Sequence, residues 1–135
     1  MSDQLSPHFG LDELRCGCRC GVPGIVLERL ERMAETLEVM RARLNRPIQV
    51  ISGYRCASRN RRVGGAPASR HLWGDAVDLQ VDGMTGLELR ALWEQAIGEG
   101  SIPDGGLGTY ADRPSTLHYD QRRVRARWHH ERAAR

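Results

Sequence analysis

A single helical stripe dominates the hydrophobic pattern of the chain. Between residues 25 and 44, apolar side chains recur every three or four positions, as they do on the buried face of an α-helix. These positions are Val26, Leu30, Met33, Leu37, Met40 and Leu44. Asn45-Arg46-Pro47 follows, and the residue before a proline is driven out of helical backbone. The pattern therefore predicts one long amphipathic helix that ends near residue 45.

Shorter patterns predict a sheet in the rest of the chain. Runs of β-branched residues or two-residue alternation, both typical of strands, occur in four segments. These segments are 48–51, 75–81, 105–110 and 115–120. Further helices are expected over residues 59–63 and 84–97. The order of these elements predicts an α+β fold in one domain, with a small, mainly antiparallel sheet flanked by helices.

The two ends of the chain differ from its middle. Residues 1–24 hold six Gly and Pro residues, and they predict an irregular arm that carries three of the four Cys. Residues 121–135 contain six Arg and one Glu, a formal charge of +5, so the remainder of this +3 chain carries about −2. We expect residues 121–135 to form a basic C-terminal tail, which either favours anionic cell-wall polymers or is only solvated.

Composition and targeting signals narrow the class of protein. No stretch approaches the ~20 apolar residues of a membrane-spanning helix. The N-terminus lacks a basic region followed by an apolar run, so we expect synthesis in the cytoplasm without a classical signal peptide. A nucleic-acid binder would use the basic tail, but the body lacks basic patches interleaved with aromatic residues. We therefore expect no nucleic-acid partner, no membrane span and a monomer.

Three residues have the chemistry of a metal site. His71 lies seven positions before Asp78, near the start of a predicted strand, and His118 lies in the last one. Two imidazoles and one carboxylate suit Zn²⁺, and three protein ligands leave a fourth position for water. Spacing alone leaves the matter open, because a chain with five His residues offers several such triples.

The wider pattern is more specific. Ser69-x-His71-x-x-Gly-x-Ala-x-Asp78 is followed by Gly-x-Gly-x-Tyr and then by His118-x-Asp120. This order resembles the zinc D-alanyl-D-alanine carboxypeptidase family of peptidoglycan peptidases, the LAS group, which shares its fold with the hedgehog signalling domain. The stretch from Ile51 to His71, and the arm with its Cys-Gly-Cys run, are similar to the compact bacterial and phage members. The resemblance covers nearly the whole chain.

The resemblance implies a function and a role for each matching residue. It implies a zinc peptidase that acts on the cell wall and hydrolyses peptidoglycan stem peptides or cross-links, either as a carboxypeptidase or as an endopeptidase. A phage lysin, a phage tail component and a cellular enzyme all fit. The matches to the zinc ligands are His71, Asp78 and His118. The matches to substrate-binding positions are Tyr54, Arg55 and Ser69. A guanidinium group suits that role, because it offers paired donors to a carboxylate.

One position departs from the wider family. Many relatives carry an acidic general base three residues before the last ligand, where this chain has Ser115. Asp120 is the nearest acid, and residues two apart on a strand share a face, so Asp120 can lie beside the metal with His118. We expect Asp120 to be the catalytic base. A role in orienting a ligand, or in a surface salt bridge to the basic tail, stays open.

The four cysteines form a second candidate site. Cys16, Cys18 and Cys20 alternate in the arm, and Cys56 directly follows Arg55. A structural tetrathiolate site would add a second zinc ion and tie the arm to the active-site loop, although such sites usually space paired cysteines by two to four residues. Free thiols and disulfides are the alternatives, and stable disulfides are less expected without a signal peptide.

A non-catalytic, zinc-containing domain that binds the cell wall is the alternative function. Hedgehog domains show that the implied fold need not hydrolyse peptides, and Ser115 in place of an acid supports this alternative. The intact ligand triple and Arg55 favour a peptidase. Hydrolysis that a chelator abolishes would distinguish the two.

Overall fold

The fold combines a five-stranded sheet with two main helices. The computed structural model describes residues 3–132. Its elements are β1 (Gln4–Ser6), β2 (Phe9–Gly10), α1 (Leu11–Leu14), α2 (Gly24–Leu44), β3 (Gln49–Ser52), α3 (Ala57–Arg62), the 3-10 helix η1 (Arg70–Trp73), β4 (Ala76–Gln80), α4 (Gly86–Gly98), β5 (Gly106–Tyr110), β6 (Arg113–Asp120) and β7 (Ala126–His130). The larger sheet has the order β3-β4-β6-β5-β7. Within the described residues, β5 and β7 run parallel and the other pairs antiparallel. The expected α+β fold is confirmed.

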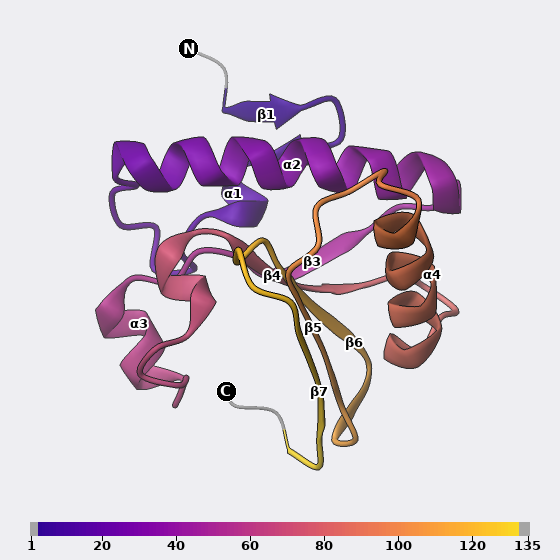
Figure 1. The fold of residues 1–135 in the computed structure, drawn as a ribbon. Coiled ribbons are helices and arrows are strands. Elements are labelled where there is room, and N and C mark those ends of the chain that lie inside the picture. The colour runs from indigo at the N-terminus through magenta and orange to yellow at the C-terminus, as the bar shows by residue number, and fades with distance from the viewer. Residues whose placement is uncertain (1–2, 133–135) are drawn as a thin grey trace.

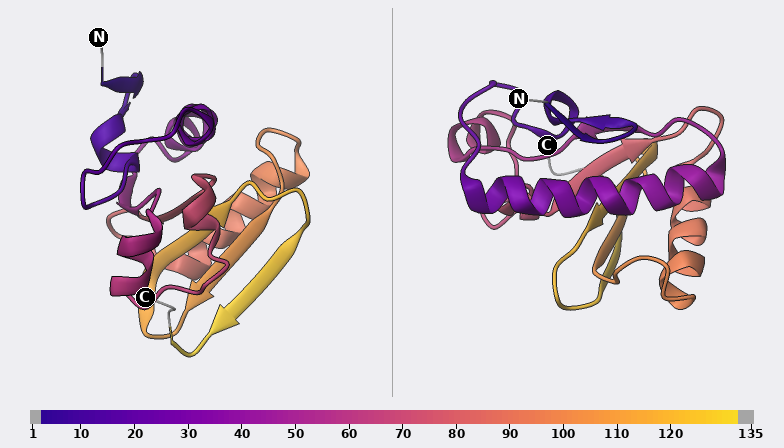
Figure 2. Two further views of the ribbon diagram at one scale, coloured as in Figure 1. Left: turned by 90° about the vertical axis from the view of Figure 1, so that its left-hand side faces the viewer. Right: turned by 90° about the horizontal axis from the view of Figure 1, so that it is seen from above.

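Two helices enclose the core from different sides. The apolar stripe of α2 is buried from Val26 to Met40, and α2 lies across one end of the sheet (Figure 1). Figure 2 shows α2 nearly end-on in its left view. α4 packs against β5 and β6, and its fully buried Trp93 lies 6.1 Å, centroid to centroid, from the ring of Tyr119. Together the helices cover the apolar side of the sheet.

Alternation along the central strands separates a core face from a polar face. The fully buried residues of the core face are Val77, Leu79, Leu117 and Tyr119. Asp78 and His118 alternate with them and so point to the opposite face. They are also direct partners in the β4–β6 ladder. One strand pair therefore builds both the core and the polar side on which a site can form.

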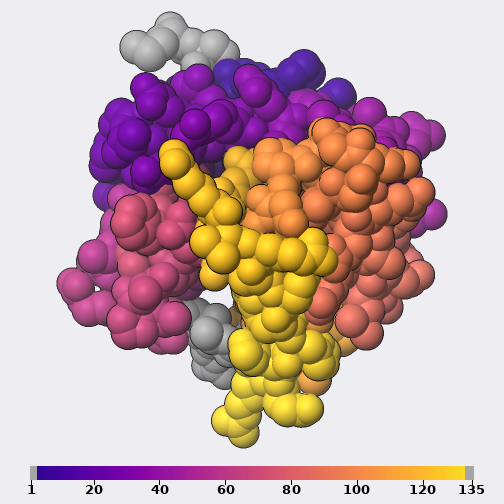
Figure 3. Space-filling view, viewed as in Figure 1, coloured from indigo at the N-terminus to yellow at the C-terminus, as the bar shows by residue number. Residues whose placement is uncertain are grey.

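Both ends of the chain are more ordered than the sequence predicts. In the arm, β1 and β2 pair, and the Glu38 carboxylate of α2 accepts hydrogen bonds from the Ser6 hydroxyl and the His8 backbone, each at 2.6 Å. The expected basic tail contains β7, an edge strand that runs along the front of the molecule (Figure 3). Arg127 of β7 binds Glu94 and Asp104, each at 2.8 Å. Acidic partners from α4 and the following loop therefore hold this basic segment.

Candidate metal centre

Three side chains converge from one loop and two neighbouring strands. η1 carries His71, β4 carries Asp78 and β6 carries His118. His71 Nε2 lies 3.3 Å from Asp78 Oδ2, and His118 Nδ1 lies 3.1 Å from Asp78 Oδ1. One donor atom from each residue lies within 4.8 Å of the others. Such spacing suits a single ion, because zinc bonds to nitrogen and oxygen are about 2.0–2.2 Å long.

Each imidazole is held by its second ring nitrogen. His71 Nδ1 donates to the Gly53 carbonyl oxygen at 2.7 Å, and His118 Nε2 donates to Asp120 Oδ2 at 2.7 Å. In the neutral, metal-binding form of each ring, these bonds leave lone pairs on His71 Nε2 and His118 Nδ1, the two atoms that face Asp78. Fixing the outer nitrogen in this way is the usual support for metal-binding histidines. Two neutral nitrogens and one carboxylate oxygen therefore fit a zinc ion in both chemistry and orientation.

The electrostatics of the triple favour positive charge. Burial opposes the ionised form of Asp78, but the neighbouring His71 and the hydrogen bond from His118 outweigh it and hold the pKa of Asp78 well below its usual range. Burial also opposes the charged form of His118. Hydrogen bonds to Asp120 and Asp78 outweigh that effect and raise the pKa of His118 to about 9. A group of this kind attracts a cation.

Asp120 contacts a different ring nitrogen of His118 from the one that faces Asp78. Its carboxylate is fully buried and contacts His118 through Nε2, whereas Nδ1 is the atom that faces Asp78. Asp120 Oδ1 accepts from the backbone of Gly106 and Arg122 at 3.1 Å and from Arg122 Nε at 2.8 Å. Its Oδ2 accepts a further bond from the Arg122 guanidinium at 2.8 Å. The shared face of His118 and Asp120 was foreseen, but the geometry corrects the expectation that the carboxylate faces the metal position.

Two of the sequence-predicted substrate residues, Arg55 and Ser69, line a cavity with the triple, whereas Tyr54 belongs to the hydrophobic core. Arg55 is 8% exposed, and its Nε has no hydrogen-bond partner among the described residues. Burial lowers the pKa of its guanidinium, and the nearby Asp78 carboxylate opposes that shift. Ser69 accepts a bond from the His71 backbone at 3.2 Å and so caps η1. Tyr54 is buried beside Arg55, whereas Ser115 is exposed on β6.

A small cavity of about 210 Å³ opens beside the metal position. Arg55, Ser69 and the three ligands line one side. The other side comes from the C-terminal half of the chain, through Tyr110, Arg122, Trp128 and His130. Asp78 is the one carboxylate in this lining. The cavity therefore offers an open position beside the three candidate ligands and the buried guanidinium of Arg55. It also contains the imidazole of His130, which is not one of those ligands.

Sequence reasoning missed the contribution of β7 to this cavity. The Trp128 ring lies 5.0 Å from the His118 ring, centroid to centroid. The guanidinium carbon of Arg122 lies over the Trp128 ring, 5.3 Å from its centroid. The available signal was Gly108 in the Gly-x-Gly-x-Tyr motif. A Cβ atom at Gly108 would lie 2.1 Å from the Trp128 ring, so glycine at this position makes room for the indole over β5.

A larger cavity of about 580 Å³ shares Arg55 and Asp78 with the small one. It extends toward the arm and toward α3, and its lining is rich in arginine: Arg15, Arg59, Arg62 and Arg113 join Arg55. Asp12 and Glu13 are its acidic members apart from Asp78. The two cavities therefore share one candidate ligand, Asp78, and one buried arginine, Arg55.

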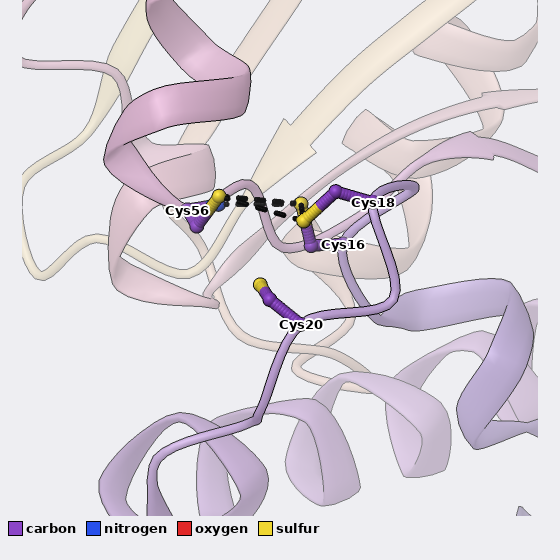
Figure 4. Close-up of side chains that lie close together, drawn as sticks. All are labelled: Cys16, Cys18, Cys20 and Cys56. Carbon is purple, nitrogen blue, oxygen red and sulfur yellow. Dashed lines mark hydrogen bonds between the residues drawn. The ribbon is translucent and has the colours of Figure 1, made fainter.

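The four cysteines also come together, beside Gly17 and Arg59 of the larger cavity. Their sulfur atoms lie within 4.8 Å of one another, and all four are free thiols (Figure 4). Cys16 is buried, Cys18 is exposed, and Cys20 and Cys56 are partly buried. Within residues 3–132, the molecule therefore holds two separate groups of side chains that could bind a metal ion.

Comparison with known proteins places the chain in a family. A model of the Peptidase M15 family matches residues 7–118, which is most of the chain and includes all three ligands of the His71–Asp78–His118 triple. A search of curated proteins gives no match. Within residues 3–132, no helix is both long enough and apolar enough to cross a membrane. The chain belongs to the Peptidase M15 family, whose members are zinc-dependent metallopeptidases.

Proposed function

From this family membership we propose that the chain is a zinc peptidase that hydrolyses peptidoglycan stem peptides or their cross-links. The observation that carries the proposal is the combination of an oriented His71–Asp78–His118 triple with the buried, unpartnered Nε of Arg55 in one cavity. A structural site would be closed by a fourth protein ligand, whereas three ligands beside a cavity leave a position for substrate or water.

The triple would hold the zinc ion, and Asp120 would keep it in place. When bound, zinc supplies a Lewis acid and lowers the pKa of a coordinated water toward neutrality. His71 Nε2, His118 Nδ1 and one Asp78 oxygen are the donors for this ion. Asp120 acts on His118 Nε2 as a positioning residue, and Arg122 holds Asp120 in turn. This role replaces the expected role of Asp120 as the base.

Arg55 would bind the peptide. A buried guanidinium with a free N–H retains a strong donor for a carboxylate or a peptide carbonyl. Its position between the two cavities lets a substrate extend to both sides of the metal position. The arginines of the larger cavity favour an anionic peptide, and stem peptides carry free carboxylates. Ser69 lies at the edge of the small cavity and can contact the same substrate.

His130 is the residue we assign to proton transfer. The small cavity has no carboxylate except Asp78, and its other titratable groups are the ligands, three arginines and Tyr110. Burial raises the pKa of Tyr110 to about 12, and Asp78 adds to the effect, so this phenol is a poor acceptor at neutral pH. A neutral imidazole has a ring nitrogen that can accept a proton. His130 can accept a proton from the nucleophile and pass it to the leaving amine.

One observation favours the second candidate, a non-catalytic domain that binds the cell wall. Asp120 is engaged by Arg122 and His118, and Ser115 is exposed, so within residues 3–132 the small cavity has no carboxylate besides the ligand Asp78. In that case Arg55 and the basic cavity would bind wall peptides without cleaving them. The two candidates make opposite predictions for the products of the reaction.

The test is digestion of purified peptidoglycan by the zinc-loaded protein, followed by mass analysis of the released peptides. A peptidase releases peptides with new termini, and their masses identify the bond that is cut. His71→Ala is the matched inactive control, because it removes one ligand of the triple. Retention of the wall polymer with no new termini would support the non-catalytic domain and contradict the peptidase.

A further inference from the structure

The second group of ligands is made of sulfur alone. Cys16, Cys18 and Cys20 come from the loop after α1, and Cys56 comes from the start of α3 (Figure 4). The Sγ atom of Cys56 lies 3.7 Å from that of Cys16 and 3.6 Å from that of Cys18, and Cys16 and Cys18 lie 3.2 Å apart. Zinc–sulfur bonds of about 2.3 Å in a tetrahedron place neighbouring sulfurs roughly 3.8 Å apart.

The loop geometry explains how cysteines with a one-residue gap can share one centre. The Arg19 N–H donates to the Cys16 carbonyl at 2.9 Å, which closes a turn over residues 16–19. Arg19 itself has a φ of 61°, in the left-handed region, and this reverses the chain toward Cys20. The Arg15 guanidinium donates to the carbonyls of Arg19 and Cys20, each at 3.0 Å. A tight turn held by these hydrogen bonds therefore brings together cysteines that are separated by one residue, whereas usual sites separate paired cysteines by two to four residues.

The surroundings of the sulfurs suit thiolate ligands. The Cys56 N–H points to Cys16 Sγ at 3.5 Å, and the Arg59 N–H points to Cys56 Sγ at 3.4 Å. The Arg59 side chain also lies against Gly17, between two of the cysteines. Backbone N–H donors and a nearby cation offset the negative charge that four thiolates bring to one metal ion.

Packing and cross-linking do not account for the cluster. Cys16 belongs to the buried core and Cys20 and Cys56 pack partly against it, but Cys18 is exposed, so packing does not explain the fourth thiol. The three sulfur separations among Cys16, Cys18 and Cys56 exceed 3 Å, whereas a disulfide bond is about 2.05 Å long. Cys16 and Cys56 are 40 residues apart in the chain, yet the fold brings their sulfur atoms to within 3.7 Å.

The cluster adjoins the backbone segment from Gly53 to Cys56, which supports the candidate metal centre. Next to it, the Tyr54 N–H donates to the Leu14 carbonyl at 2.8 Å. A Cβ atom at Gly53 would lie 2.4 Å from that carbonyl oxygen, so only glycine permits this approach of the two backbones. Gly53 in turn accepts the hydrogen bond of His71 Nδ1, and Arg55 is the residue before Cys56.

We propose that Cys16, Cys18, Cys20 and Cys56 bind a second, structural zinc ion that clamps the arm to the Gly53–Cys56 segment. Four protein ligands close this centre, so it has no position for substrate. Its function is to hold the backbone that orients His71 and that presents Arg55. Metal content and the cobalt spectrum measure this second site directly, so the result does not depend on peptidase activity.

The test is metal analysis of the full-length protein, purified under reducing conditions with zinc, together with the absorption spectrum of its cobalt form. The wild type should hold two ions per chain. His71→Ala should hold one, and its cobalt form should keep the intense thiolate-to-cobalt charge-transfer band. Cys18→Ser should also hold one ion but should lose that band. Ser58→Ala, an exposed change on α3, should match the wild type.

Two results would overturn the proposal. One is a single ion in the wild type and none in His71→Ala, with no charge-transfer band in either cobalt form. The other is a mass two hydrogens below that of four thiols in protein kept reduced, which would mean a disulfide. Because His71→Ala leaves all four cysteines intact, its cobalt spectrum decides the question even where Cys18→Ser fails to fold.

Discussion

The two groups of metal-binding side chains differ in completeness and in surroundings. The His71–Asp78–His118 triple has three ligands, and its histidines are buried and hydrogen-bonded by their outer nitrogens. The cysteine cluster has four candidate ligands, three from the loop after α1 and one from the start of α3. The triple lines the small cavity together with the buried Arg55, and none of the four cysteines lines that cavity.

This difference teaches which group performs chemistry. An open coordination position is useful only where substrate can reach it, and there the protein must hold its ligands by other means. Gly53 and Asp120 provide that support for the triple. The cysteine cluster needs no such cavity, because a closed centre contributes to folding rather than to catalysis. Since Gly53 lies between the two groups, the closed centre supports the open one.

Chelation should separate the two centres and gives the largest expected effect. A chelator should remove the zinc of the three-ligand centre first, and activity should fall to background while the fold stays intact. The four-thiolate ion should leave later, together with the structure of the arm. Zinc release, activity and circular dichroism followed in one time course would show two phases, and zinc added after the first phase should restore activity. Release of both ions in one step would contradict the distinction.

Substitution of His130 tests whether the open centre obtains its base from β7. His130→Asn should lower kcat by ~10²–10⁴-fold, the usual contribution of general acid–base catalysis. The zinc content should not change, because His130 is not a ligand. His129→Asn is the matched control, since the ring of His129 bonds to the Thr109 hydroxyl and does not line the small cavity. Equal kcat values for the two variants would remove His130 from the mechanism.

Asp120→Asn should weaken the open centre while leaving the closed one unchanged. The amide cannot accept the paired hydrogen bonds of Arg122 and His118 as the carboxylate does. We expect about a 10–100-fold loss of zinc affinity at the triple, the usual cost of removing a partner of a metal-binding histidine. Competition with a metal indicator measures this affinity. Full affinity with a large loss of kcat would restore Asp120 as the base.

The smallest effect concerns the ion pairs that hold β7, and with it Trp128 and His130, against the rest of the fold. Burial opposes the charge of Asp104, but hydrogen bonds from Arg127, Gly105 and Arg125 outweigh it and lower its pKa from 3.8 to about 2. A lowered pKa stabilises the fold above the unfolded value and ceases to do so as pH falls from about 4 to 2.

Asp104→Asn should therefore lower the free energy of unfolding by less than about 1 kcal/mol at neutral pH, because solvent screens this half-exposed pair. The difference from the wild type should vanish as the pH falls toward 2. Urea titrations of both proteins at several pH values measure it, with zinc removed from both samples. A difference that persists at pH 2 would mean that the effect does not come from the charge of Asp104.

The sequence predicted the triple through the family motif, and local rules explain only part of its geometry. Two-residue alternation put Asp78 and His118 on one face of their strands, and the structure pairs them directly. The same rule put Asp120 beside His118, which is correct. It could not tell which ring nitrogen Asp120 contacts, because that depends on the orientation of the imidazole and on Arg122.

The C-terminal segment was mispredicted for a different reason. Six arginines in residues 121–135 look solvated when read alone, yet the partners of Arg127 lie 33 and 23 residues earlier in the chain. β7 also pairs in parallel with β5, so the two strands are not joined by a tight turn whose residues could have predicted the pairing. Such interactions join residues far apart in the chain, so the local pattern of hydrophobic residues cannot predict them.

The most direct measurement is an anomalous difference map from crystals of the zinc-loaded protein, recorded on either side of the zinc absorption edge. The account predicts a peak between His71 Nε2, His118 Nδ1 and Asp78, with its remaining coordination position facing the cavity that contains Arg55. A second peak should lie among the four cysteine sulfurs. A map with no peak at the triple, in crystals grown with excess zinc, would contradict the account.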